Sequence, residues 1–94
     1  MVTYIILWSF TDQGLKTIKQ STERAEFFRV QAEQHGIEVK ETYWTMGAYD
    51  GVVILEAPDD EAVARLMLLT SSLGTVRGQT LRAFTQEQMS RILE

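Results

Sequence analysis

The sequence of 94 residues contains no cysteine, which excludes disulfides, thiol nucleophiles, zinc knuckles and iron–sulfur sites. Its single histidine leaves no imidazole cluster for a transition metal, and we expect neither a metal nor a cofactor. No apolar run approaches the roughly 18 residues of a membrane span, and no charged segment precedes the apolar start of the chain. These absences predict a soluble, unprocessed, cytoplasmic protein with no membrane partner.

Positive charge is also scarce. Nine Lys and Arg against thirteen Asp and Glu give a net charge of −4, the wrong sign for binding a phosphate backbone, so we expect no nucleic-acid partner. One proline and six scattered glycines leave no room for a linker. Residues 1–94 are therefore expected to form a single domain.

The hydrophobic periodicity predicts the element order β-α-β-β-α-β, followed by a short helix. We expect strands at about residues 3–10, 39–46, 51–57 and 76–84. We expect helices from Ser21 or Thr22, as the cap, to about His35, from Asp59 to Leu73, and after Thr85, where Gln88 completes a capping box. A single helical turn is expected within residues 15–20.

This order is the ferredoxin-like α+β pattern, whose four-stranded antiparallel sheet has the strand order 4-1-3-2. The first and third strands are apolar at both odd and even positions, as central strands are, whereas the second and fourth carry charges. Two helices cover only one face of such a sheet. The other face, with either the Tyr4 set or the Ile5 set, would expose an apolar patch in a monomer. We therefore expect a homodimer, or a multiple of dimers, with sheets face to face.

The bend after the second strand reads Gly47-Ala48-Tyr49-Asp50, and it resembles the motif for which the GYD domain family is named. Further segments resemble the family in the right order, at residues 11–14, 43–45, 56–59 and 81–85, so the resemblance covers nearly the whole chain. One departure is Thr22, where the family pattern leads us to expect proline; threonine changes only how that helix begins.

The resemblance implies a dimeric α+β barrel, which agrees with the fold expected from the strand pattern. It implies no single activity. Related barrels include cofactor-free monooxygenases, muconolactone-type isomerases, haem-dependent enzymes and ligand-sensing regulatory domains, so the fold alone does not choose a function.

The first candidate site lies at the end of the sheet that holds the bend. Trp44, Tyr49 and Asp50, with Trp8 nearby, have the aromatic walls and few polar groups that a planar organic ligand needs. Tyr49 could donate a proton, and Asp50 could orient it. The alternative is that both tryptophans are core residues and that Asp50 accepts hydrogen bonds from the backbone amides of the turn.

The second candidate lies at the opposite end, where Glu56 and Arg82 flank the strand that carries Tyr4. A guanidinium beside a carboxylate could bind an acidic ligand, although such a pair is as well explained as a structural ion pair. His35 fits the C-terminus of a helix, and the acids at residues 59–61 fit a helix start, so neither is expected to be a site.

Two hypotheses of function remain open. In the first, the protein is a cofactor-independent oxygenase or isomerase acting on a small aromatic or enolic molecule, with Tyr49 and Asp50 as catalytic residues, Trp8 and Trp44 as pocket walls and Arg82 holding negative charge. In the second, it is a non-catalytic small-ligand-binding or oligomerisation module. A pocket into which Tyr49 and Asp50 point favours the enzyme, and outward positions for both favour the module.

Overall fold

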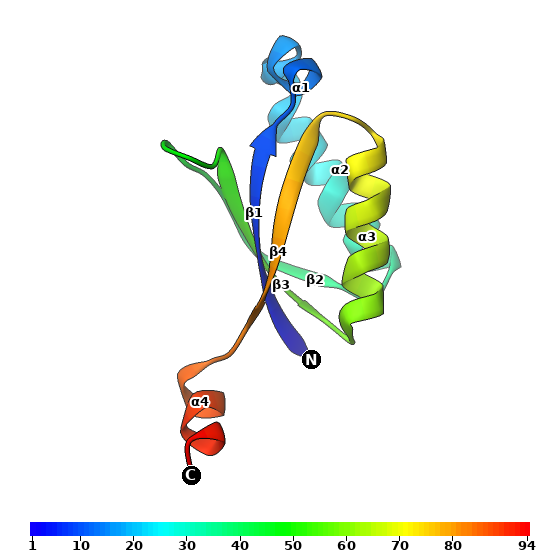
Figure 1. The fold of residues 1–94 in the computed structure, drawn as a ribbon. Helices are drawn as coiled ribbons and strands as arrows, with labels where there is room; N and C mark the ends of the chain where they lie inside the picture. Colours follow the sequence, from blue (N-terminus) through cyan, green and yellow to red (C-terminus); the bar gives the residue numbers. More distant parts are fainter.

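The computed structural model describes residues 1–94 and contains four strands and four α-helices in the expected order (Figure 1). The elements are β1 (Val2–Phe10), α1 (Asp12–Lys16), the 3₁₀ turn η1 (Ile18–Gln20), α2 (Ser21–Gln34), β2 (Glu38–Trp44), β3 (Gly51–Ala57), α3 (Asp60–Ser72), β4 (Val76–Ala83) and α4 (Gln86–Ile92). The second strand ends two residues earlier than expected, because the backbone N–H of Thr45 already donates across the bend to the carbonyl of Asp50, at 2.8 Å.

The sheet has the order β2-β3-β1-β4 and is antiparallel throughout, which confirms the ferredoxin-like α+β class. β1 pairs with β3 on one side and with β4 on the other, so the two strands with continuous apolar runs are central. The charged strands β2 and β4 form the edges, as expected from their composition.

Alternation along the central strands decides which residues meet the helices. Tyr4, Ile6 and Trp8 of β1 are buried, and so are Val53 and Leu55 of β3. These side chains face α2 and α3, which lie on the same side of the sheet (Figure 1). The core is therefore one layer between helices and sheet, to which the helices add Ala32, Ala62, Val63 and Leu66.

The opposite side of the sheet has no helix over it. Its residues alternate with the buried ones, and we call this surface the open face. In register across the sheet it carries Tyr43 and Glu41 of β2, Val52 and Ile54 of β3, Ile5 and Leu7 of β1, and Leu81 and Gln79 of β4. The two central strands present only aliphatic side chains at the middle of this face, so the Ile5 set is the one left without a helix.

The helix starts agree with the sequence except at α2. The side chain of Asp59 caps α3 by accepting from the Ala62 N–H at 2.9 Å, and Thr85 and Gln88 form the expected capping box. The N-cap of α2 is instead Gln20, which makes no side-chain cap. The 3₁₀ turn runs directly into this helix, and the N–H of Ser21 already donates to the carbonyl of Ile18, so no separate cap is needed.

The last helix lies away from the rest of the domain. The chain leaves the end of β4 and forms α4 well beyond the sheet (Figure 1). The dimensions of the chain, 49 × 30 × 17 Å, reflect this elongation. None of the helices is long and apolar enough to cross a membrane.

Candidate functional site

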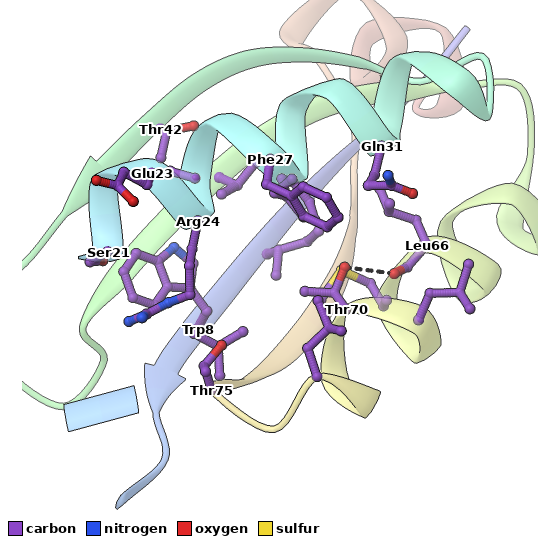
Figure 2. Close-up of a pocket in the computed structure, with 18 of the residues that line it drawn as sticks. Trp8, Ser21, Glu23, Arg24, Phe27, Gln31, Thr42, Leu66, Thr70 and Thr75 are labelled. Carbon is purple, nitrogen blue, oxygen red and sulfur yellow. Dashed lines mark hydrogen bonds between the residues drawn. The ribbon is translucent and has the colours of Figure 1, made fainter. Parts of the chain in front are cut away.

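A groove of about 480 Å³ lies on the helix side of the sheet, between the first half of α2 and the second half of α3. Figure 2 shows Phe27 of α2 and Thr70 of α3 on its two sides, with Trp8 of β1 at one end. Twelve of the 21 residues that line it are hydrophobic, so its interior suits an apolar group.

The groove exists because the helices do not close over the sheet at this end. The helical spacing of Leu66, Leu69 and Leu73 in the sequence is typical of a buried stripe. In the structure Leu69 and Leu73 instead line the groove and are at least half exposed. Leu66, one turn earlier, is buried. On α2, Phe27 lies off the stripe of Ala25, Phe28 and Ala32, and its ring is 52% exposed at the groove. The apolar pattern therefore extends beyond the core into an accessible surface.

Trp8 has its position fixed by a glycine. A Cβ atom at residue 51 would lie 2.0 Å from Cζ2 of Trp8, so the indole packs directly on the backbone of Gly51. The ring makes edge-to-face contacts with Phe10, at a centroid distance of 5.1 Å, and with Trp44, at 6.0 Å. Trp8 and Trp44 thus lie together at the groove.

Several polar groups around the groove are hydrogen-bonded within the chain, whereas Glu23 also lines the groove without such a partner. The indole N–H of Trp44 donates to Oγ of Ser21 at 2.9 Å. The Arg24 guanidinium donates to both oxygens of Thr17 at 3.0 Å, and the hydroxyl of Thr70 donates to the carbonyl of Leu66 at 2.8 Å. No group of three acidic, histidine or cysteine side chains that could hold a metal occurs in the chain. The groove thus offers mainly apolar surface, with the charged side chains of Glu23 and Arg24 along its α2 side.

Tyr49 and Asp50 do not line this groove. The hydroxyl of Tyr49 donates to Oε1 of Gln79 at 2.8 Å, and Gln79 belongs to the open face. The carboxylate of Asp50 accepts from the backbone N–H of Phe10 at 2.8 Å, so it binds a backbone amide, but one of β1 and not one of the turn. Tyr49 and Asp50 therefore have separate partners, and Asp50 does not orient the tyrosine.

Glu56 and Arg82 lie on opposite faces of the sheet. Glu56 pairs in register with Thr3 and shares the open face, where the nearest cation is Lys40 at 3.9 Å. Arg82 pairs with Tyr4, a helix-side residue, and its guanidinium lies over the ring of Phe84 at 4.4 Å. The expected pairing of a guanidinium with a carboxylate is therefore not formed, because neighbouring residues of a strand point to opposite faces.

The ionisable group that the fold changes most is Tyr4, at the end of the sheet away from the groove. Its hydroxyl donates to a carboxylate oxygen of Asp60 in the first turn of α3. Burial of the phenol, together with this hydrogen bond to an acceptor that favours the neutral form, raises the pKa of Tyr4 to about 12. Tyr4 is therefore held as a protonated donor in the core.

Most groove residues on α2 and α3 were missed by reasoning from chemistry-bearing residue types. Phe27, Leu69 and Leu73 carry no reactive group, and helical spacing assigned the two leucines to the core. One signal was present, since Phe27 falls off the apolar stripe of its helix. An aromatic side chain on the edge of a stripe indicates a second contact surface.

Comparisons with known proteins agree with this geometry. The family model described as GYD domain matches residues 4–93. A protein of Thermus thermophilus, described as "Glutamine synthetase and cystathionine beta-lyase binding protein", is 38% identical over 84 residues, which make up 88% of this chain and 88% of that protein. No solved structure matches the chain significantly.

Proposed function

The chain belongs to the GYD domain family, and from this premise we propose that it is a non-catalytic binding protein whose partner is another protein. The observation that carries the proposal is the groove between α2 and α3, which presents mostly apolar surface and in which several polar groups are hydrogen-bonded within the chain. An oxygenase or isomerase needs a proton donor or base in its pocket. The two residues expected in that role, Tyr49 and Asp50, lie elsewhere.

The first partners to test are glutamine synthetase and cystathionine beta-lyase, because the relative that shares 38% of its residues over 84 positions is described as binding them. The groove fits a short apolar segment of such an enzyme. Phe27, Leu69 and Leu73 stand on its sides with about half of their surface exposed, and Trp8 and Trp44 form its aromatic end. Aromatic and aliphatic side chains of this kind are typical anchors of protein interfaces.

We also propose that the protein is a homodimer, or a multiple of dimers, through the open face. The middle of this face consists of Ile5, Leu7, Val52 and Ile54, which a monomer would leave partly in water. A second copy offers the same aliphatic surface, and such self-complementarity is what a two-fold interface requires. The groove is then left free, since it lies on the other side of the sheet. A cytoplasmic location stays a prediction of the same proposal.

The partner-binding proposal is tested by the variant Leu69→Glu, which places a charge in the groove. Binding to purified glutamine synthetase or cystathionine beta-lyase, measured by isothermal titration calorimetry, is expected to weaken by roughly tenfold or more, since interface anchors cost over about 1 kcal/mol when lost. Leu68→Glu is the matched control: it changes the neighbouring leucine of α3, which is 73% exposed and does not line the groove.

Equal binding by both variants would remove the groove from the interface. If neither enzyme binds the wild-type protein, these two enzymes are not its partners. Titration with small phenolic compounds in place of an enzyme tests whether the groove binds a small ligand instead, which its volume of about 480 Å³ would accommodate. In that case the compounds would quench the fluorescence of Trp8 and Trp44, and the variant Leu69→Glu would abolish the quenching.

A further inference from the structure

The C-terminal arm, which we define as residues 84–94, finds no support from its own domain. It leaves the sheet after β4 and lies apart from every other element (Figure 1). All hydrogen bonds of residues 85–94 stay within these residues, including the capping box and the pair between Arg91 and Glu87 at 2.9 Å. Helix α4 has seven residues, whereas an isolated helix is marginal below about 12 to 15. Its stability must come from packing against something else.

Helix α4 has one uncharged apolar side. Met89, Ile92 and Leu93 are spaced three and four residues apart and share this side. Met89 is 39% exposed, Ile92 57% and Leu93 76%, so the chain covers this side of the helix only in part. The two charges within the helix, Glu87 and Arg91, pair with each other on the far side. The charges thus leave the apolar side free to enter an interface.

The size of the open face indicates what the arm contacts. Four strands about 4.8 Å apart and about seven residues long give each copy a face of roughly 20 by 23 Å. Two such faces in contact bury on the order of 1,000 Å², whereas standard interfaces bury about 1,200 to 2,000 Å². A dimer held by the sheets alone would therefore fall below this range. Additional apolar surface, such as that of α4, would bring it to the size of a stable interface.

The arm begins where the proposed sheet interface ends. Ala83, the last residue of β4, pairs with Thr3 and lies on the open face. The next residue, Phe84, is held under the guanidinium of Arg82, which fixes the direction in which the arm leaves the sheet. The arm therefore follows directly after a residue of the surface on which a second copy would sit.

We propose that the C-terminal arm of each copy packs its Met89, Ile92 and Leu93 side against the second copy and so clasps the dimer. This proposal rests on the dimer proposed above, and it states that the molecule covering the apolar side of α4 is another copy of this chain. Each interface then contains two arms related by the two-fold axis. The arm is the part of the interface that the sheet geometry alone would not supply.

The variant Ile92→Glu tests the clasp. Sedimentation equilibrium is expected to show the dimer dissociation constant rising by roughly tenfold or more, because a charge would enter an apolar contact. Ser90→Glu is the matched control, since it places the same charge on an exposed position of the same helix and is expected to leave dissociation unchanged. Equal dissociation constants for both variants and the wild type would overturn the proposal and leave the sheet dimer standing.

A crosslinking experiment tests the contact without depending on affinity. Because the chain has no cysteine, Leu93→Cys provides a single attachment point for a thiol-directed photocrosslinker. Irradiation is expected to join two chains, giving a product of twice the chain mass in denaturing gels. Products joined only within one chain would show that the arm folds back on its own domain and would overturn the proposal. A wild-type protein that is monomeric in sedimentation would overturn the dimer and the clasp together.

Discussion

Among single residues, Tyr4 couples the sheet to a helix through one hydroxyl. It is buried on β1 and donates to Asp60, whose position is set by the first turn of α3. The phenol has a higher pKa in the folded chain, about 12, than the ordinary value of 10.0 that it regains on unfolding. Between these two pKa values the folded chain keeps the proton of Tyr4 and the unfolded chain has lost it, so unfolding releases a proton. The free energy of unfolding must therefore fall as the pH rises from about 10 to about 12.

Tyr4→Phe is expected to remove this dependence. Below about pH 10 the wild-type hydrogen bond is fully present, and its loss should lower the free energy of unfolding by roughly 1.5 to 3 kcal/mol, as for bonds to charged groups. Between about pH 10 and 12 the wild type should approach the variant. Urea denaturation of both proteins at several pH values measures this, and parallel curves up to about pH 12 would contradict the account.

At the scale of elements, β1 and β3 are in close contact where the indole of Trp8 packs on Gly51, the first residue of β3. Gly51 lies under the indole of Trp8 with no space for a side chain, and Trp8 in turn touches Phe10 and Trp44. The hairpin end of the sheet, one end of the groove and the packing of β1 on β3 therefore depend on the same glycine.

Gly51→Ala is expected to displace the Trp8 ring and to lower the free energy of unfolding by roughly 1 to 3 kcal/mol, the usual cost of overpacking a core. The displaced indole should also narrow the groove and shift tryptophan fluorescence. Thermal unfolding and emission spectra check both effects. An unchanged melting temperature would mean that the indole does not pack on residue 51.

The order and type of the helices and strands could be predicted from the hydrophobic and capping patterns of the sequence, because each of these patterns has a single physical cause. The apolar runs of β1 and β3 require central strands, and the Thr85–Gln88 box requires a helix start. The start of α2 was less predictable, since its cap depends on a preceding 3₁₀ turn rather than on Ser21. The side chain of Ser21 instead accepts from Trp44, a residue far along the chain.

The candidate sites were harder to predict because residues at one end of a sheet can point to either face. Glu56 and Arg82 were correctly placed at the same end, but their registers with Thr3 and Tyr4 put them on opposite sides. Tyr49 likewise joins Gln79 across the open face. Trp8 and Trp44 lie together on the helix side, apart from Tyr49.

For the molecule as a whole, the proposed dimer should make stability depend on concentration. Dimer formation stabilises the folded state by mass action, so the melting temperature is expected to rise by a few degrees for each tenfold increase in protein concentration. Differential scanning calorimetry over a hundredfold concentration range measures this. A melting temperature that stays constant over this range would contradict a dimer that dissociates on unfolding.

The groove and the open face lie on opposite sides of one sheet, and this arrangement determines valency. When two copies join through their sheets, both helix layers face outward, and the dimer carries two grooves that point away from each other. If the partner is an enzyme, as proposed, one such dimer would attach to two enzyme molecules at once, and symmetric enzymes with several equivalent sites would be bridged into larger assemblies. The avidity of such assemblies depends on the number of sites per enzyme and exceeds the affinity of one groove.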